Sequence, residues 1–325
     1  MKPFAYVRAT SVAEAARLLG AGSAAMAGGT DLLGLMKGGI AAPARVVDLT
    51  GIDGLRGWSR ERGAGLRIGA LTPLVDLETS DQLARHLPIV RAALADTATL
   101  QLRNAGTVGG NLLQRNRCWY FRDEAIPCWL KGGTRCFASE GENEHHAVIG
   151  TARGCNRVAP SDLAPALIAH DARVTLVGAR GTRSIALADL YTDPALHSRD
   201  EHTIKRGEIL TEVHVPEAGL QRRGTYLKAM ERKTWSFAVV SVAAAARVRD
   251  GKLRNPRIVL GGVAPVPWRV EAAEAEIDGH PFSDELARRA ADALLADAAP
   301  LAKNGYKVPL AKELVRRALA AIAAA

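Results

Sequence analysis

Gln101-Leu-Arg-Asn-Ala-Gly-Thr-Val-Gly-Gly-Asn111 is the stretch of this sequence that says most about its architecture. Its glycines permit close approach to the backbone, and Thr107 and Asn111 add polar side chains. A similar stretch, Ala27-Gly-Gly-Thr-Asp31, separates an apolar segment from a helical pattern that begins at Leu32, so its glycine pair is expected in a strand-to-helix turn. Backbone N–H groups at such turns can hold a pyrophosphate without a lysine. Glycines that serve only as turns are the simpler alternative.

Neither stretch has the spacing of the common nucleotide-binding motifs. A Gly-x-Gly-x-x-Gly fingerprint and a Gly-x-x-x-x-Gly-Lys-Ser/Thr loop are both missing from these two stretches. This disfavours an ordinary Rossmann site and a nucleotide hydrolase.

The four cysteines of the sequence all lie close together, directly after the second glycine stretch. They are Cys118, Cys128, Cys136 and Cys155. Thiolates that converge on one point are the ligands of iron–sulfur clusters and of structural zinc. A metal centre beside a phosphate-binding loop indicates two prosthetic groups, and hence electron transfer.

Disulfides and unpaired buried thiols account for the cysteines less well. Disulfides are typical of short secreted domains, whereas this chain has 325 residues and no hydrophobic signal segment at its start. Buried cysteines that act as small hydrophobes are expected to be scattered, not clustered among Arg, Trp and Gly. The nine, seven and eighteen residues between successive cysteines contain no Cys-x-x-Cys knuckle, which favours a cluster over zinc but leaves both metals open.

The length of 325 residues predicts two or three domains, and 48% hydrophobic and 24% charged residues are ordinary for a globular protein. The longest apolar runs, such as 237–246, are far shorter than the ~20 residues that cross a bilayer, so we expect no membrane span. Without a signal of its own, the chain is expected in the cytoplasm, or in the periplasm if it is exported with a signal-bearing partner. The net charge of +9 suits an anionic ligand or acidic partner, although arginine-rich sequences can be basic without one.

The sequence pattern alternates between strands and helices. A capping box, Ser11-Val-Ala-Glu14, predicts that a helix through Leu19 begins the fold. Further helices are predicted over 32–36, 88–98, 268–277, 284–297 and 310–324, and strands over 24–27, 45–49, 66–71, 208–215, 224–228, 239–249 and 257–263. Residues 173–191 are predicted to form a hairpin followed by a short helix.

Taken together, four motifs resemble the flavin subunit of the molybdenum hydroxylases, a family that includes the medium subunit of carbon monoxide dehydrogenase and a region of xanthine dehydrogenase. The resemblance covers nearly the whole chain. The motifs are Ala27-Gly-Gly-Thr-Asp31, Arg103-Asn-Ala-Gly-Thr-Val-Gly-Gly-Asn-Leu112, Pro160-Ser-Asp162 and Ile258-Val-Leu-Gly-Gly-Val-Ala-Pro-Val-Pro-Trp268.

The cysteines lie in an insertion between the second and third motifs, where ordinary members of the family have none. The insertion is similar to that of the flavin subunit of bacterial three-subunit aldehyde oxidoreductases. The flavin subunit of 4-hydroxybenzoyl-CoA reductase has a related insertion. The segments Arg117-Cys-Trp-Tyr-Phe-Arg-Asp123 and His146-Ala-Val-Ile-Gly150 resemble the aldehyde oxidoreductase version more closely.

This resemblance implies an α+β protein with a two-subdomain FAD-binding fold of the vanillyl-alcohol-oxidase/PCMH type and a separate C-terminal α+β domain. The FAD-binding domain would span 1–217, as subdomains 1–53 and 54–217 with an iron–sulfur insertion at about 114–156, and the C-terminal domain 218–325. A [4Fe–4S] cluster would be held by the four cysteines. The residues expected to bind FAD are Ala27, Gly28, Gly29, Thr30, Asp31, Leu32, Thr107, Gly109, Gly110, Asn111, Ser161 and Asp162.

The resemblance also implies partner chains. A large subunit with the molybdenum cofactor would oxidise the aldehyde, and a small subunit with two [2Fe–2S] clusters would pass electrons to FAD and on to an external acceptor. No catalytic residue is expected on this chain, because the substrate would be bound elsewhere.

The alternative functions range from closely related enzymes to an unrelated class of protein. The nearest are flavin subunits of enzymes like 4-hydroxybenzoyl-CoA reductase or xanthine dehydrogenase. A stand-alone NAD(P)H-dependent flavin reductase is another, although it would need no cysteine insertion. The most remote is a zinc-stabilised nucleic-acid-binding module, for which Arg103, Arg115, Arg117, Arg122 and Arg135 could form a basic patch. The same arginines could instead balance the charge of a thiolate cluster.

Several residues near these motifs have two interpretations. Asp162 is expected at the ribityl or flavin edge, with a surface helix cap as the alternative. Core packing is favoured for Trp235 and Phe237 over contact with the flavin ring. His145 and His146 are expected to face solvent and not to bind metal, because four cysteines already complete the ligand set.

Overall fold

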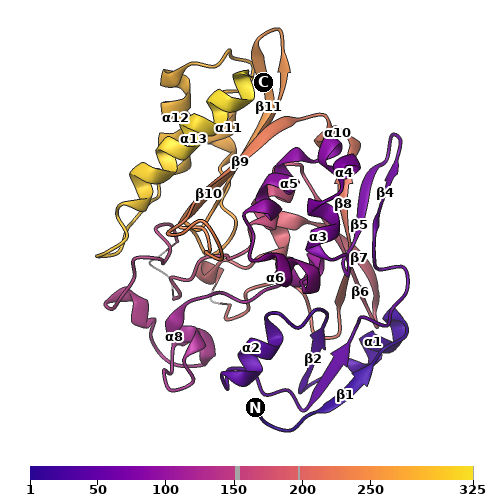
Figure 1. Ribbon diagram of the computed structural model, residues 1–325. Coiled ribbons are helices and arrows are strands. Elements are labelled where there is room, and N and C mark those ends of the chain that lie inside the picture. Colours follow the sequence, from indigo (N-terminus) through magenta and orange to yellow (C-terminus); the bar gives the residue numbers. More distant parts are fainter. Residues whose placement is uncertain (151–153, 197, 325) are drawn as a thin grey trace.

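The computed structural model describes residues 1–150, 154–196 and 198–324. Figure 1 shows a small N-terminal α/β unit, a central sheet covered by helices, an irregular segment around α8, and a C-terminal sheet backed by long helices. Among the described residues, no helix is both long and apolar enough to cross a bilayer.

The N-terminal unit contains a three-stranded parallel sheet in the order β1-β3-β2. Its strands are β1 (Ala5–Arg8), β2 (Ser23–Met26) and β3 (Arg45–Asp48), and its helices are α1 (Val12–Leu18) and α2 (Leu32–Lys37). The hydroxyl of Ser11 accepts a hydrogen bond from the Glu14 N–H at 3.2 Å, which confirms the predicted cap. The prediction that a helix begins the fold is wrong, because β1 comes first. Its burial pattern is almost entirely exposed, so it lacks the alternation that marks a strand.

The central sheet has five strands in the order β4-β5-β8-β6-β7, and all neighbours are antiparallel. The predicted hairpin, β6 (Arg173–Gly178) with β7 (Gly181–Ala186), is followed by the short 3-10 helix η3 (Leu187–Leu190), as expected. The other strands are β4 (Trp58–Glu61), β5 (Gly65–Gly69) and β8 (Ile209–Pro216). Helices that accompany this sheet are α3 (Leu74–Glu78), α4 (Asp81–His86), α5 (Pro88–Ala95), α6 (Leu100–Ala105), α7 (Val108–Leu112), α9 (Leu163–Ile168) and α10 (Glu217–Leu220). The main hydrophobic core lies between these elements.

The cysteine-containing insertion lies between α7 and α9 and has little regular structure. Its described part contains α8 (Trp119–Arg122) and the 3-10 turns η1 (Trp129–Lys131) and η2 (Phe137–Ser139). Cys128 and Cys155 are buried in a small cluster of their own, beside Leu35, Phe121 and Leu130. The insertion therefore has only a minor hydrophobic core.

The C-terminal region is a three-stranded antiparallel sheet, β11-β10-β9, with helices packed on it. Its elements are β9 (Arg223–Ala229), β10 (Val240–Arg249), β11 (Lys252–Gly261), α11 (Glu271–Ala275), α12 (Asp284–Leu294) and α13 (Lys307–Ala324). The strands and helices predicted for this region are confirmed. Buried residues recur every three or four positions along α13, from Ala311 to Ile322, and pack on β10 and β9.

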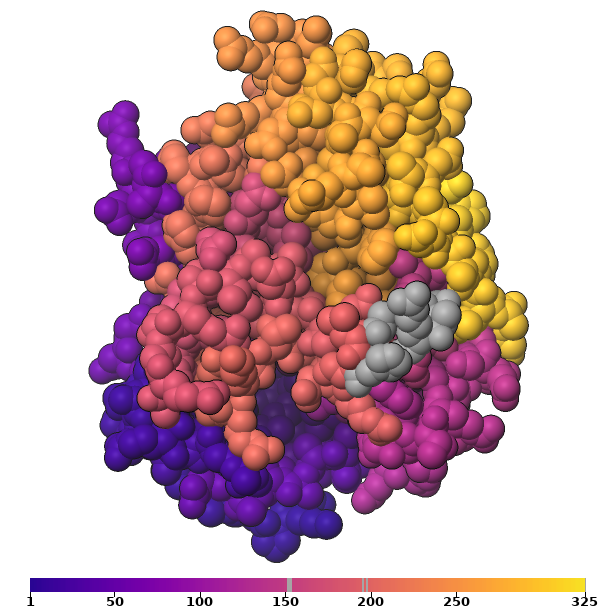
Figure 2. Space-filling view, turned by 180° about the vertical axis from the view of Figure 1, so that it is seen from behind, coloured from indigo at the N-terminus to yellow at the C-terminus, as the bar shows by residue number. Residues whose placement is uncertain are grey.

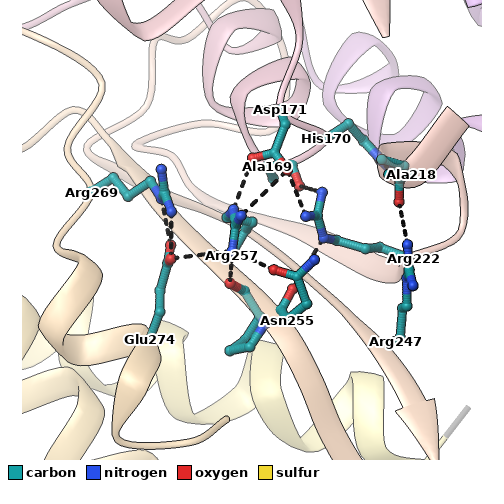
Figure 3. Close-up of polar contacts among 12 residues, drawn as sticks. Ala169, His170, Asp171, Ala218, Arg222, Arg247, Asn255, Arg257, Arg269 and Glu274 are labelled. Carbon is teal, nitrogen blue, oxygen red and sulfur yellow. Dashed lines mark hydrogen bonds and ion pairs between the residues drawn. The ribbon is translucent and has the colours of Figure 1, made fainter. Parts of the chain in front are cut away.

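Largely buried ion pairs join the C-terminal sheet to the central one (Figure 3). The carboxylate of Asp171, just before β6, accepts hydrogen bonds from Arg222 at 2.6 Å and from Arg257 at 2.8 Å. Arg257 also lies 3.6 Å from Glu274, which pairs with Arg269 at 2.7 Å. Charged pairs that share hydrogen bonds in this way fix the two sheets relative to each other.

The start of α13 holds the end of the insertion. The Lys307 ammonium donates to the carbonyl oxygens of His145, His146 and Gly262 at 2.9, 3.0 and 2.9 Å. The Asn304 amide donates to the Ala147 carbonyl at 3.0 Å. Figure 2 shows the magenta insertion directly below the yellow C-terminal helix. Residues far apart in sequence thus close one end of the insertion.

Candidate functional site

The first glycine loop connects β2 to α2 and packs tightly on α6, the helix formed by the first half of the second glycine stretch. A Cβ atom on Gly28 would lie 1.7 Å from the Ala105 carbonyl oxygen, so no other residue fits there. Gly29 has a φ of +70°, a conformation that glycine adopts readily. The N–H groups of Gly28, Gly29 and Thr30 make no hydrogen bond to the described residues. These three residues line the larger hollow described below, so their free donors can serve an anion there.

The second half of the second glycine stretch forms a short helix, α7, where the sequence indicated a phosphate-binding loop. Thr107 is its N-cap, and its hydroxyl accepts from the Gly110 N–H at 3.1 Å. A Cβ atom on Gly109 would lie 3.1 Å from Ala70, so this glycine is needed for packing. A Cβ atom on Gly110 would meet only the Thr107 hydroxyl, at 3.0 Å. Gly110 therefore keeps space open on the cavity side.

Two hollows of about 370 and 310 Å³ meet between these glycines. The larger lies against β2, α2 and apolar residues such as Leu49 and Ile209. The smaller extends toward Pro160, Asp162 and Phe237. The residues that line both hollows are Thr30, Asp31, Thr107, Gly110 and Gln114. The shape suits an elongated ligand with an anionic middle and an organic group at each end.

Ser161 is the residue that caps α9, and it also connects this helix to α7. Its hydroxyl accepts from the Ala164 N–H at 3.0 Å and donates to the Asn111 side-chain oxygen at 2.6 Å. Asp162 makes no capping hydrogen bond. The alternative in which Asp162 is a surface helix cap is therefore wrong.

Asp162 is instead a buried carboxylate that lines the smaller hollow. It accepts from the Tyr226 hydroxyl at 2.7 Å and pairs with the Lys228 ammonium at 2.8 Å. Burial raises the pKa of Asp162, although the charge of Lys228 acts in the opposite direction. Tyr226 and Lys228 both lie in β9. Single polar residues in a strand do not show from the sequence that they contact a distant carboxylate.

Trp235 and Phe237 do not pack in the core, so the interpretation favoured from the sequence is wrong for both. Their exposed fractions are 60% and 45%, and both line the smaller hollow. Trp235 has a φ of +51°, which is uncommon for a bulky residue, and its carbonyl accepts from Arg232 at 3.0 Å. The Arg117 guanidinium lies 5.0 Å from the Phe237 ring centre. These aromatic rings are displayed at the mouth of the cavity.

A third hollow, of about 610 Å³, connects this mouth to Cys118. It shares Arg117, Trp235, Ser236 and Phe237 with the smaller hollow. Its remaining lining includes Cys118, Trp119 and His146. The cavity and the cysteine-containing insertion are therefore neighbours.

The four cysteines carry free thiols that influence one another. A hydrogen bond from Cys155 lowers the pKa of Cys136 to about 6, and the same bond raises the pKa of Cys155. Burial raises the pKa of Cys118 to about 12, and the charges of Cys136 and Cys128 add to this effect. Within the described ranges, no three His, Cys, Asp or Glu side chains are already arranged around a metal position. The thiols are neighbours in the insertion, where Cys136 and Cys155 share a hydrogen bond and Cys128 and Cys136 act on Cys118.

Comparison with known sequences identifies the family. Residues 2–218 match the FAD binding domain in molybdopterin dehydrogenase, and residues 225–322 match the CO dehydrogenase flavoprotein C-terminal domain. The chain belongs to the FAD-binding subunits of the molybdenum hydroxylases. It is 40% identical to the aldehyde oxidoreductase FAD-binding subunit PaoB of Escherichia coli K12, over 98% of both chains. It is 30% identical to the carbon monoxide dehydrogenase medium chain of Hydrogenophaga pseudoflava, over 97% of this chain and 96% of that one.

Solved structures of the family have the same fold. Carbon monoxide dehydrogenase from Hydrogenophaga pseudoflava, in a form lacking the Mo-pyranopterin moiety, aligns with a TM-score of 0.78 at 28% identity, over 100% of this chain and 99% of that one. The reconstituted enzyme from Oligotropha carboxidovorans gives 0.79 at 26% identity, over 99% and 98%. The expected FAD-binding α+β fold is confirmed. The boundaries after residues 53 and 217 stay predictions.

In this FAD-binding subunit, Asp31 joins the first glycine loop to the insertion. One carboxylate oxygen accepts from the guanidinium groups of Arg117 and Arg122 at 2.6 and 2.9 Å. The other accepts from the Arg115 N–H at 2.8 Å. Since these three arginines flank Cys118, one side chain holds the start of the insertion against the cavity.

The remaining arginines that could form a basic patch also have partners within the chain. Arg103 pairs with Glu78 at 2.5 Å, and Arg115 pairs with the buried Glu201. Arg135 lies 4.6 Å over the ring of Phe137. Arginines committed to internal carboxylates and a ring are poorly placed to bind a phosphate backbone, which disfavours the nucleic-acid alternative.

The prediction that both histidines face solvent is wrong for His146. His145 is partly exposed and lies 3.2 Å from Glu231. His146 is only 3% exposed, and its Nε2 atom lies 3.2 Å from the Cys118 sulfur. Burial, and then the charge of Lys307, lowers the pKa of His146 to about 4. Adjacent identical residues in a loop carry no periodic signal that could distinguish these two environments.

Proposed function

We propose that FAD lies across the two hollows with its pyrophosphate at the glycines. The free N–H groups of Gly28, Gly29 and Thr30 and the open side of Gly110 support this position. The buried Asp162 lines the smaller hollow, on the side of the aromatic mouth, and is proposed to meet the flavin end. The full proposed contact set is Ala27, Gly28, Gly29, Thr30, Asp31, Leu32, Thr107, Gly109, Gly110, Asn111, Ser161 and Asp162.

A [4Fe–4S] cluster on Cys118, Cys128, Cys136 and Cys155 is the second part of the proposal. The donor set fits this group chemically, because an all-thiolate cluster takes four cysteine ligands and all four cysteines of this insertion are free thiols. The insertion has a minor core, so metal ligation would supply folding free energy that packing does not. His145 has no part in the ligand set.

The proposed function is electron transfer within a molybdenum-dependent aldehyde oxidoreductase. Bound FAD would supply the conversion between two-electron and one-electron steps. The observation that carries this proposal is the position of Cys118 beside the cavity mouth, in a chain 40% identical to an aldehyde oxidoreductase FAD-binding subunit. Within this chain, Arg117 and Phe237 lie between the smaller hollow and Cys118.

The proposed partners are a large subunit with the molybdenum cofactor and a small subunit with two [2Fe–2S] clusters. Relatives named as medium chains of carbon monoxide dehydrogenase support an assembly of this kind. Electrons would enter FAD from the small subunit and leave to an external acceptor. No residue of this chain is assigned a catalytic role toward the aldehyde.

The decisive measurement is the FAD, iron, acid-labile sulfide and zinc content of the purified chain. Stoichiometric FAD with four iron and four sulfide per chain is expected. Zinc in place of iron would support the alternative structural site, and FAD without metal would contradict the cluster. Rapid flavin reduction by NAD(P)H alone would favour a stand-alone flavin reductase.

The assembly is tested by co-expression with the two proposed partner subunits. The isolated chain is expected to bind FAD without oxidising aldehydes, and the complex is expected to reduce its flavin when aldehyde is added. Aldehyde oxidation by the single chain at the rate of the complex would contradict the assignment. Activity on 4-hydroxybenzoyl-CoA or on purines, with none on aldehydes, would favour the neighbouring enzyme types.

A further inference from the structure

Ring packing and backbone hydrogen bonds hold His146 beside Cys118. Its ring packs edge-on against Trp119, with ring centres 5.2 Å apart at 78°. The backbone N–H of His146 donates to the Asn143 carbonyl at 3.0 Å, and its backbone carbonyl accepts from the Lys307 ammonium at 3.0 Å. The position of the ring is thus fixed from both the insertion and α13.

The contact between His146 and Cys118 has a defined direction once the sulfur binds metal. A ligand thiolate has no proton, so it can only accept a hydrogen bond. The 3.2 Å separation from Nε2 to the Cys118 sulfur then requires an N–H on Nε2. The second ring nitrogen, Nδ1, is buried and has no partner among the described residues. The sulfur is therefore the one hydrogen-bond partner that the described part of the chain offers this ring.

We propose that His146 donates an N–H···S hydrogen bond to Cys118 and thereby raises the reduction potential of the cluster. The inference rests on the cluster of the proposed function. Reduction adds one electron, and so one negative charge, to the cluster and its thiolates. A donor aimed at a ligand sulfur stabilises the reduced form more than the oxidised form. His146 is a positioning residue here, since the four cysteines complete the ligand set.

The test compares three variants in the complete complex: His146→Phe, His146→Gln and His145→Phe. Phenylalanine keeps a ring against Trp119 but removes the donor, whereas glutamine keeps an N–H donor. His145→Phe is the matched control, because the neighbouring histidine lies against Glu231. Iron content is measured first, and the midpoint potential of the cluster is then measured by a redox titration followed by EPR.

His146→Phe is expected to retain iron and to shift the midpoint potential to a more negative value. His146→Gln is expected to shift it less, and His145→Phe to leave it unchanged. Iron loss in His146→Phe with retention in His146→Gln would also support a required donor. An unchanged potential in His146→Phe, an equal shift in His145→Phe, or iron loss in both His146 variants would overturn the inference. A wild-type complex without cluster iron would instead contradict the proposed function, before any variant is made.

Discussion

The FAD cavity and the cysteine insertion are built in opposite ways. The cavity uses backbone N–H groups and glycines without side chains, held between the N-terminal unit and the central sheet, each of which has its own hydrophobic core. The insertion depends on side chains, the four cysteines and Asp31 with its arginines, in a segment with a minor core. A cradle made of backbone can exist before its ligand arrives, whereas a site made of thiols on irregular chain needs the metal to order it.

Replacing any one of the four cysteines should give the largest effect. It tests whether the insertion needs its metal in order to fold. Cys128→Ser, for example, is expected to abolish most cluster iron and to make the insertion sensitive to protease, because ligation contributes its folding free energy. FAD content should fall much less than iron content. Full iron retention in all four single variants would show that the cysteines are not the ligands, and complete loss of FAD would show that the two regions fold as one.

Adding a side chain at Gly110 tests whether the FAD cavity depends on open backbone at its glycines. Gly110→Val should fill the space where the pyrophosphate is proposed and lower FAD affinity on the order of 100-fold, or about 2.7 kcal/mol. Gly20→Val is the matched control, since a Cβ atom there meets nothing within 4 Å and lies away from the FAD hollows. FAD affinity is measured by titration of the flavin-free protein. An unchanged affinity would remove α7 from the proposed site.

Asp31 belongs to both regions, so its replacement shows how strongly they are coupled. Asp31→Asn should weaken each of the hydrogen bonds to Arg117 and Arg122 by about 1 kcal/mol, because a neutral amide oxygen is a weaker acceptor than a carboxylate. Both FAD and iron content are expected to fall in part. Loss of iron with unchanged FAD affinity would mean that Asp31 serves the insertion alone.

The smallest effect is expected for the exposed Trp235. Trp235→Gly removes the unfavourable positive φ but adds backbone freedom to the unfolded chain, so the free energy of unfolding should change by less than about 1 kcal/mol. Flavin fluorescence should nevertheless change, because Trp235 lines the smaller hollow. A large loss of stability measured by denaturant unfolding would show that this residue is structural.

Much of the fold could be predicted because its elements carry periodic or capping signals. The hairpin of β6 and β7, the cap at Ser11 and the long C-terminal helix were all predicted correctly. The sequence did not indicate β1, whose exposed residues lack alternation, or the helical form of α7, whose glycines are poor helix formers. Local pattern fails where tertiary contacts decide the conformation.

Some site residues could also be recognised from the sequence, whereas the environment of others could not. Cysteines and glycine pairs stand out by type and spacing, so the candidate ligands and loops could be named. Asp162 was named but its environment was not, because its buried partners Tyr226 and Lys228 come from a distant strand. His146 was misjudged for a similar reason, since the contacts that bury it come from Trp119 and from Lys307.

The hydrogen bonds from Lys307 to the insertion bear on the order in which parts of the chain can fold during synthesis. The ribosome adds Lys307 about 150 residues after Cys155, a delay of roughly 8–30 s at synthesis rates of about 5–20 residues per second. Until then, the carbonyl oxygens of His145 and His146 lack the ammonium group that holds them. The glycine cradle, whose residues are all made earlier, can close during this delay. We therefore expect the insertion to reach its final conformation later than the glycine cradle, because one of its anchors is made last.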